Sequence, residues 1–364
     1  MKNFFRFIGL GQCGMRIAQE FEKVGFYTAV INSDEVDGRG YNLEEEKILV
    51  LKGTGTGKSL KIGKQIIENN KSKFESFIRR NCNKNGLTIF IAGGGGGTGG
   101  SFIAPAVEYT KSLGYKVGIL YTLPPKMLGI IPAENSLRTL KEILKVETDF
   151  FMLIDNELLI NEVGKDETWW GKINRMILST FYSSIEIIRE NKTAQHGLGS
   201  IDKGELLRSL TYGKGCTDIR RYYLTASECD QDEEKLEELL FKPQLVEGYN
   251  YKETKCYLVS IDIPQQGNYT AIAKKIFDLI KYKVGNSIAI LGMFSDPLLK
   301  DSIKVTLINS GLQLPKILQS RIKNLRRDEK AFQHKQEKED NIVNTFSDLD
   351  FDEDASFDKD FQLK

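Results

Sequence analysis

The sequence predicts an α/β protein with two domains, and three observations lead to this prediction. The chain has 364 residues, whereas a typical domain has ~150. Hydrophobic residues make up 40% of it, and 33 glycines bring the apolar share close to that of ordinary globular proteins. Over residues 1–160, short apolar runs alternate with longer amphipathic stretches, which is typical of parallel strands joined by crossover helices.

The strands expected in the first domain form a Rossmann-like parallel sheet. The runs that predict them are Asn3–Leu10, Thr28–Asn32, Lys47–Leu51, Leu87–Ala92, Tyr115–Thr122 and Phe150–Asp155. A helical pattern over Arg16–Val24 follows the first strand, and others follow the later ones. Ligands of open parallel sheets bind beyond the carboxyl ends of the strands, where the loops of this chain are rich in Gly, Asn or Asp.

A long core helix is expected next, over Trp169 to about Asn191, because its apolar residues recur every three or four positions. A smaller α/β domain follows it. The patterns that predict this domain are the strands Lys255–Ile263, Ser287–Met293 and Ile303–Leu307 and a helix over Tyr269–Tyr282. The predicted divisions of the chain are 1–168, 169–196, 197–314, 315–338 and 339–364.

The last two of these divisions carry opposite charge. A helix is predicted from Pro315 to about Gln336, and residues 321–338 hold seven Lys and Arg against three Asp and Glu. Residues 341–364 hold seven Asp and Glu against two Lys, with Asp, Ser and Phe in low-complexity alternation. This composition predicts a disordered acidic tail after a basic helix.

Composition also disfavours several kinds of site. The net charge of +1 gives no global field toward nucleic acid or membranes. The five cysteines are scattered without a CxxC pair, and there are only two histidines, so we expect no disulfide framework and no protein metal site. No signal sequence or membrane-length apolar run is present, and the sequence therefore predicts a cytoplasmic protein.

The strongest local signal is AGGGGGTGGS, Ala92–Ser101, which lies between an apolar strand and a helical pattern. Seven glycines in ten residues cannot be explained by packing, and their backbone N–H groups predict an anion-binding nest at the positive end of the following helix. A flexible linker is the alternative interpretation, but a linker would not separate a buried strand from an amphipathic helix.

A second glycine loop, GLGQCG, also follows a strand. Gly9, Gly11 and Gly14 fit the dinucleotide pattern GxGxxG, and Asp34 lies 20 residues beyond Gly14, where a ribose-binding acid belongs. A NAD-dependent oxidoreductase is therefore an alternative. The second nest, in Ala92–Ser101, argues against it, because a dehydrogenase has no use for one.

A third loop, KGTGTGKS, covers Lys52–Ser59. It misses the P-loop pattern GxxxxGK[ST] because Lys52 stands where that pattern requires glycine. Glycine loops after three strands indicate a single polyphosphate that is held from several sides.

Five motifs in order, between residues 11 and 206, resemble the tubulin/FtsZ superfamily. GGGTGGS, Gly95–Ser101, resembles the tubulin signature loop, and GQCG, Gly11–Gly14, is similar to the first phosphate loop of eukaryotic tubulins. LIDNE, INRMI and GLGSIDKGEL resemble the loop before the core helix, the core helix and the catalytic loop. LIDN and PAEN look most like the prokaryotic TubZ branch of plasmid- and phage-borne filaments.

The resemblance implies a site for GTP or GDP, with Mg²⁺ held mainly by phosphates and water. Asn156 and Asn174 would hydrogen-bond guanine, and the alternative for both asparagines is a turn or capping role. Trp170 would stack on the base, and its alternative is a role in the core. FtsZ proteins contact the ribose through acidic and basic residues of the loop that reads KMLGIIPAEN in this chain. Because this loop departs from the FtsZ pattern, Glu134 is the residue assigned to the ribose. The remaining nucleotide contacts are expected from Gly11, Gln12, Cys13, Asn32, Asp34, Gly53, Gly55, Gly95, Gly96, Gly97, Thr98, Gly99 and Gly100.

Asp202 and Glu205 match the paired acids of the family's catalytic loop. The resemblance implies that they enter a neighbouring subunit's site and polarise the attacking water. Their alternative role is structural, because D-x-x-E is also a helix capping box. Catalysis completed between subunits would require head-to-tail contact, which propagates into a filament.

We therefore expect a GTPase whose homopolymeric filaments move plasmid or phage DNA through a DNA-binding adaptor protein. Direct strong DNA binding and membrane contact are not expected. The adaptor would bind the basic segment 321–338, which is otherwise a solvated helix face. An FtsZ-like cell-division filament, the NAD-dependent oxidoreductase and a binding module without catalysis are the alternatives.

Overall fold

The computed structural model describes residues 1–34, 43–51, 53, 55–163, 169–188, 193–194, 200–229, 231–266 and 269–324, with only the backbone at 193–194. The predicted acidic tail, most of the basic segment 321–338 and residues 197–199 of the predicted catalytic loop lie outside the described residues. Within the described part of the chain, residues 316–324 are helical at the start of the predicted basic helix.

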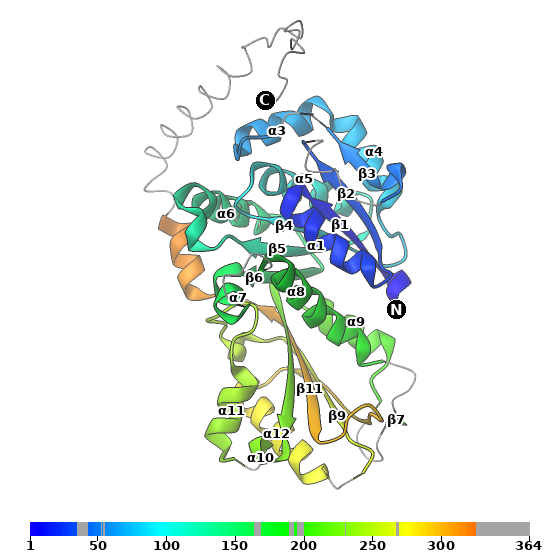
Figure 1. Ribbon diagram of the computed structural model, residues 1–364, viewed down its shortest axis with the longest axis vertical. Helices are drawn as coiled ribbons and strands as arrows, with labels where there is room; N and C mark the ends of the chain where they lie inside the picture. Colours follow the sequence, from blue (N-terminus) through cyan, green and yellow to red (C-terminus); the bar gives the residue numbers. More distant parts are fainter. Residues whose placement is uncertain are drawn as a thin grey trace, which may run out of the picture. The chain divides into compact units, whose positions relative to one another are not determined.

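Residues 1–323 form one compact unit that contains two sheets. The sheet before the core helix, which together with its helices we call the first domain, is the predicted parallel sheet and has six strands in the order β3-β2-β1-β4-β5-β6 (Figure 1). Its two central strands are buried except at Arg6, which is typical of a sheet with helices on both faces. The strands are β1 (Phe5–Leu10), β2 (Tyr27–Asn32), β3 (Ile48–Val50), β4 (Leu87–Gly93), β5 (Lys116–Leu123) and β6 (Phe150–Asp155). The helices are α1 (Gly11–Lys23), α3 (Leu60–Asn69), α4 (Lys71–Asn81), α5 (Gly97–Ser112), α6 (Ile130–Ile143) and α7 (Asn156–Val163).

The register between β1 and β4 aligns the two main glycine loops. Leu10 pairs with Ala92, so the chain leaves β1 at Gly11 beside the point where it leaves β4 after Gly93. Helix α1 begins directly at Gly11, earlier than the predicted Arg16, because no loop residue intervenes.

The core helix α8 (Trp169–Glu186) joins the first sheet to the second domain (Figure 1). It ends before the predicted Asn191, and Ile187 and Ile188 form a turn. Phe181 lies at the centre of an aromatic cluster, with ring centroids 5.4 Å from both Phe5 and Phe7 and 6.0 Å from Phe150. These edge-to-face contacts fix the helix against the sheet.

The second domain holds a five-stranded sheet in the order β7-β10-β9-β11-β8. The predicted strands are present, and β8 is an additional long strand that the sequence analysis missed. The strands of this sheet are β7 (Thr193–Ala194), β8 (Cys216–Thr225), β9 (Cys256–Ile263), β10 (Ile288–Ser295) and β11 (Ser302–Leu312). Its helices are α9 (Lys203–Thr211), α10 (Ala226–Cys229), α11 (Glu233–Phe241) and α12 (Thr270–Val284). Short 3₁₀ turns cover Lys2–Phe4, Glu45–Lys47, Lys126–Leu128 and Tyr251–Glu253.

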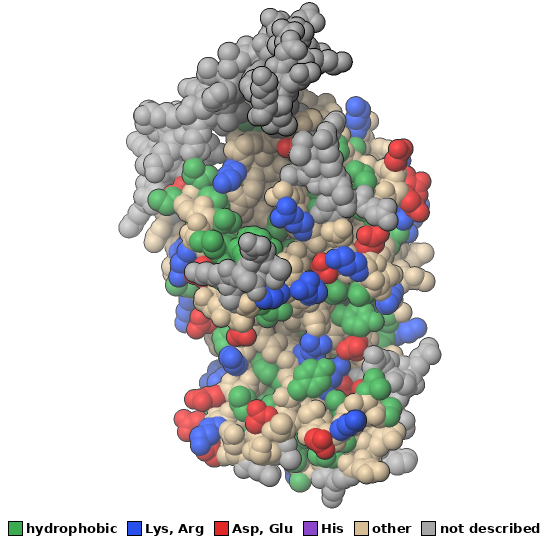
Figure 2. Space-filling model, in the orientation of Figure 1, with side chains coloured by type: hydrophobic (Ala, Val, Ile, Leu, Met, Phe, Trp, Pro, Cys, Tyr) green, Lys and Arg blue, Asp and Glu red, His purple; other side chains and the backbone are tan. Residues whose placement is uncertain are grey.

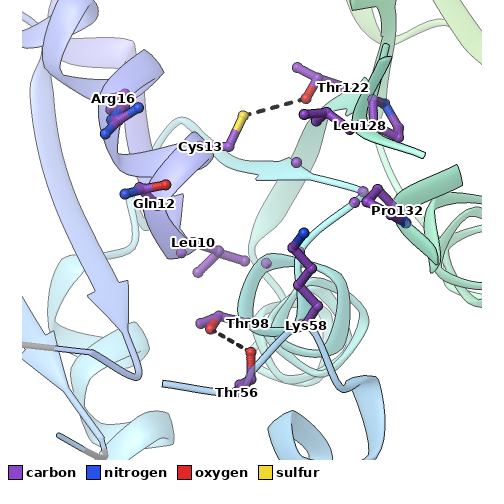
Figure 3. Close-up of a pocket in the computed structure, with 18 of the residues that line it drawn as sticks. Leu10, Gln12, Cys13, Arg16, Thr56, Lys58, Thr98, Thr122, Leu128 and Pro132 are labelled. Atoms are coloured by element: carbon purple, nitrogen blue, oxygen red, sulfur yellow. Dashed lines mark hydrogen bonds between the residues drawn. The ribbon is translucent and has the colours of Figure 1, made fainter. Parts of the chain in front are cut away.

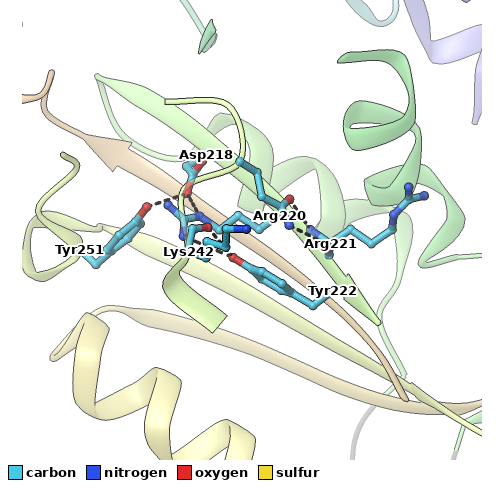
Figure 4. A network of polar contacts seen from close by, with 7 residues as sticks. Asp218, Arg220, Arg221, Tyr222, Lys242 and Tyr251 are labelled. Carbon is cyan, nitrogen blue, oxygen red and sulfur yellow. Dashed lines mark hydrogen bonds and ion pairs between the residues drawn. The ribbon is translucent and has the colours of Figure 1, made fainter. Parts of the chain in front are cut away.

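Strand β8 carries charged residues inside the protein, which is why its hydrophobic pattern is weak. Arg220 is 1% exposed and its Nε donates to Asp218 Oδ2 at 2.6 Å (Figure 4). Its guanidinium also donates to the Lys242 carbonyl oxygen at 3.0 Å and lies over the Tyr251 ring. The buried cation therefore has hydrogen-bond partners for Nε and Nη1 within its own domain.

Across the described residues, no helix combines the length and the apolar composition that crossing a bilayer requires.

Candidate functional site

A cavity of about 620 Å³ opens at the carboxyl ends of β1 and β4 (Figure 3). The chain leaves these adjacent strands in opposite directions along the sheet, and ligands of doubly wound folds bind at such a switch point. The described residues that line the cavity are Leu10, Gly11, Gln12, Cys13, Arg16, Ser33, Asp34, Gly55, Thr56, Gly57, Lys58, Gly93, Gly94, Gly95, Gly96, Gly97, Thr98, Gly99, Thr122, Pro124, Pro125, Leu128, Pro132, Asn156, Trp170 and Asn174.

Most glycines of the loop after β4 are required by close packing, contrary to the sequence analysis. A Cβ atom at Gly94 would overlap the Tyr121 hydroxyl, and one at Gly97 would overlap Thr56 Oγ1. At Gly100 it would lie 2.6 Å from Thr139 Oγ1. Among the glycines of this loop, only Gly96 could carry a Cβ atom with no other protein atom within 4 Å of it. At Gly96, therefore, the protein itself leaves room for a side chain.

Two helix N-termini border the cavity. Gly11 begins α1 and Gly97 begins α5, and neither helix has a side-chain cap. Their first N–H groups have no intrahelical partner and form a positive surface that suits an anion. Thr98 extends this surface, since its hydroxyl oxygen lies 2.6 Å from that of Ser33 and 3.4 Å from that of Thr56.

Cys13 borders the same surface as a neutral group. Its Sγ lies 3.5 Å from Thr122 Oγ1 (Figure 3). Burial raises the pKa of the Cys13 thiol, although the Thr122 hydrogen bond lowers it in part. The thiol therefore stays protonated at neutral pH and does not repel an anion.

Carboxamides from two helices occupy another part of the cavity wall. Asn156, at the start of α7, is 3% exposed, and Asn174 on α8 is 8% exposed. Asn156 Oδ1 is buried without a hydrogen-bond partner in the described chain. A buried amide oxygen without a partner costs free energy, so this atom is available to a ligand donor. Trp170 lines the cavity as well, with one face stacked on Trp169 at 3.8 Å.

The cavity brings together most of the residues predicted to bind nucleotide, but four of them do not line it. Asn32 is buried, and its Nδ2 donates to Met15 Sδ at 3.2 Å. Gly100 packs beneath the loop, against Thr139 and Leu60. Gly53 and Glu134 lie outside the lining residues as well. The ribose contact assigned to Glu134 is therefore without support in the structure.

Several residues of the cavity wall were not predicted from the sequence. Ser33 and Thr56 supply hydroxyls, and Arg16 and Lys58 supply cations. Lys58 could have been found from the sequence, because it lies in the GKS that matches the end of the P-loop pattern in the third glycine loop. Arg16 carried none, since exposed arginines are common on amphipathic helices.

Asp202 and Glu205 do not line the cavity of their own chain. They form the capping box of α9, in which Glu205 N donates to Asp202 Oδ1 at 2.7 Å and Asp202 N donates to Glu205 Oε2 at 3.0 Å. The structural alternative for this pair is therefore present. Asp202 is exposed and Glu205 half-buried, so both carboxylates remain open to an approaching molecule.

No protein-family model matches the chain. Sequence relatives are nevertheless found among tubulin-like proteins. Tubulin-like protein CetZ of Thermococcus kodakarensis is 26% identical, over 89% of this chain and 86% of that protein. Tubulin-like protein CetZ2 of Haloferax volcanii is 25% identical, over 57% of this chain and 60% of its own length. Cell division protein FtsZ of Wigglesworthia glossinidia brevipalpis is 22% identical, over 73% and 67%.

Solved structures share the fold over nearly the whole chain. A GTPγS-form protofilament of TubZ from Bacillus thuringiensis serovar israelensis has a TM-score of 0.75 and 19% identity, covering 92% of this chain and 93% of that one. CetZ1 of Haloferax volcanii, a GDP-bound monomer, has a TM-score of 0.69 and 18% identity, covering 89% and 97%.

Proposed function

Because the chain belongs to the tubulin/FtsZ superfamily, we propose that it is a GTPase whose subunits add head to tail into filaments. One observation carries the nucleotide assignment. The cavity joins an anion-binding surface, made by two uncapped helix N-termini, to buried carboxamides and an indole ring. That combination suits a nucleotide with a hydrogen-bonding purine. The solved relatives in GDP and GTPγS forms support guanine.

The proposed reaction is hydrolysis of the γ-phosphate. The oxygen of a water molecule bonds to the γ-phosphorus, and the bond to the β–γ bridging oxygen breaks, with its electron pair left on GDP. The water proton passes to phosphate or solvent. Asp202 and Glu205 of an adjoining subunit would orient this water, because neither acid lines its own cavity. Mg²⁺, proposed as the cofactor, would be held mainly by phosphate oxygens and water.

Two conservative variants separate catalysis from helix capping. Asp202→Asn and Glu205→Gln keep a side-chain oxygen for each capping bond but remove the charge. We expect unchanged melting temperatures, intact GTPγS binding and turnover lowered by about 10²-fold or more. The measurement is phosphate release per subunit against protein concentration, with sedimentation of the same samples. Wild-type turnover in both variants would contradict the assignment of these acids.

Concentration dependence tests whether catalysis is completed between subunits. Turnover per subunit should rise at the same threshold concentration at which the protein begins to sediment. If turnover per subunit were independent of protein concentration and nothing sedimented, the protein would still be a GTPase, but the proposal that it forms filaments would be wrong. Binding of NAD in preference to GTP would instead favour the oxidoreductase alternative.

An apolar lip beside the cavity supports self-association. Met127, Leu128 and Ile130, which form this lip, are 61%, 44% and 64% exposed. Leu128 also lines the cavity, so a subunit seated over the nucleotide would cover the lip. Met127→Asp and Ile130→Asp should raise the threshold concentration about tenfold without lowering the melting temperature. Leu144→Asp, at a leucine elsewhere that is 51% exposed, is the control. If sedimentation began at the same protein concentration for all three variants, the lip would not be part of the contact between subunits.

Segregation of plasmid or phage DNA is the task that we propose for the filaments, through a DNA-binding adaptor. Cationic and anionic side chains are interspersed on the face drawn in Figure 2, where the described residues present no broad basic field to DNA. A CetZ-type or FtsZ-like cytoskeletal task is the alternative, since these relatives match the sequence. Loss of a host plasmid after gene deletion, with normal cell shape and division, would support segregation. Altered shape or division with stable plasmids would support the alternative.

A further inference from the structure

Lys58 has an unusual backbone conformation in the wall of the cavity. Its φ is 65°, and no other non-glycine residue of the described chain has a positive φ. L side chains disfavour this region, which glycine adopts without strain. A lysine here therefore indicates either a strong local constraint or a function for its side chain.

The backbone of Lys58 is held from two sides. Asn135, fully buried on α6, donates its Nδ2 hydrogen to the Lys58 carbonyl oxygen at 2.8 Å. Gly97 lies against the same residue, where a Cβ atom would come within 2.9 Å of the Lys58 carbonyl carbon. Ser59, the next residue, caps α3 through its hydroxyl. The carbon from which the side chain extends is thus fixed relative to α3, α5 and α6.

The Lys58 side chain, by contrast, has no partner in the described chain. It is exposed, and Figure 3 shows it extending toward the centre of the cavity. The same loop meets the anion-binding surface through Thr56, whose hydroxyl lies 3.4 Å from that of Thr98. The carboxamides Asn156 and Asn174 come from other elements, α7 and α8. A cation on this loop is therefore placed for phosphate rather than for the base.

We propose that Lys58 binds the terminal phosphate of a nucleoside triphosphate, so that one chain by itself distinguishes triphosphate from diphosphate. This inference rests on the proposed function and names a specificity-determining residue of that site. An ammonium that reaches the terminal phosphates is what the P-loop lysine provides. The loop around Lys58 lacks the backbone N–H groups with which a P-loop surrounds the phosphates. In this chain the loops at Gly11 and Gly95–Gly99, which line the same cavity, would supply those groups instead.

The test is the affinity of the full chain for GTPγS and for GDP, measured separately. Lys58→Ala should weaken GTPγS binding at least tenfold and GDP binding less than twofold, because only the triphosphate carries the group that the ammonium contacts. Lys58→Arg should retain most of the GTPγS affinity. Lys64→Ala, which removes an exposed lysine from the adjacent α3, is the control and should bind both nucleotides like the wild type.

Lys58→Gly separates binding from a structural role. Glycine accommodates the positive φ, so this variant should melt at or above the wild-type temperature and still lose GTPγS affinity. Equal losses for GTPγS and GDP, or no loss for either, would overturn the assignment of Lys58 and leave the proposed function standing. A wild-type protein that binds neither nucleotide would overturn both.

Discussion

Two cations of this molecule, Arg220 and Lys58, show how differently its two domains use polar groups. Arg220 is buried in the second sheet, where Asp218, Tyr222 and a backbone carbonyl oxygen take its hydrogen bonds. Lys58 lies at the cavity of the first sheet, and its side-chain ammonium has no hydrogen bond or ion pair to any described residue. One cation is satisfied by the protein, and the other remains available to a ligand.

The same difference extends to the surroundings of each cation. In the second sheet, Lys304 on β11 pairs with Asp262 on β9 at 3.7 Å and with Glu186, at the end of α8, at 3.0 Å. Around the cavity, by contrast, the N-termini of α1 and α5 have no side-chain cap, and the Asn156 carboxamide oxygen has no hydrogen-bond partner in the described chain. Polar groups that are paired inside a protein specify its fold, whereas unpaired ones in a cavity indicate a binding site.

The largest effect is expected from Arg220→Ala. Loss of the guanidinium leaves the Asp218 carboxylate buried without its ion-pair partner, which should lower the free energy of unfolding by about 3–5 kcal/mol. Urea unfolding measures this change, and GTPγS affinity below the transition should remain that of the wild type. Arg175→Ala, at an exposed arginine on α8, is the control and should change stability by less than about 0.5 kcal/mol. A stability loss no larger than the control's would mean that Arg220 is not a structural cation.

A smaller effect is expected from two neighbouring glycines of the cavity. Gly96→Ala should weaken GTPγS binding about tenfold, or roughly 1.4 kcal/mol, because its methyl group would occupy ligand space and nothing in the protein opposes it. Its melting temperature should match that of the wild type. Gly97→Ala should lower the melting temperature, since Thr56 and the Ser59 carbonyl oxygen already fill that space. Isothermal titration and thermal unfolding of both variants measure these changes, and unaltered affinity in Gly96→Ala would remove this loop from the ligand.

The smallest effect is expected from Asp155→Asn, where β6 meets α7. Burial raises the pKa of the Asp155 carboxyl above its ordinary value, so its contribution to stability is present at low pH and is lost as the pH rises through the raised pKa. Asparagine keeps an oxygen for the Glu157 N–H and removes the charge. The variant should melt up to about 4 °C higher at pH 7 and like the wild type near pH 3. A lower melting temperature at pH 7 would mean that attraction to nearby cations outweighs burial.

Much of the first domain could be predicted because its strands are runs of predominantly apolar residues. The runs at Leu87–Ala92 and Phe150–Asp155 differ by at most one residue from β4 and β6. Strand β8 could not be predicted, because Asp218 and Arg220 resemble surface residues until Tyr251 and Lys242 are folded against them. The end of α8 was misplaced for a related reason, since the apolar period continues through Ile187 and Ile188 after the helix has ended.

The sequence by itself determined the parallel sheet, the glycine loops at its carboxyl ends and the resemblance to tubulin-like proteins, because these follow from local composition and periodicity. Only the tertiary structure decided what each polar residue does. Seven glycines in Ala92–Ser101 look alike in the sequence, yet packing excludes a side chain at Gly97 and leaves room at Gly96. Arg220 and Lys58 are likewise both cations in the sequence, and only the folded surroundings separate the paired one from the unpaired one. The role of a polar or small residue depends on neighbours that the chain supplies from distant positions, and folding alone brings these together.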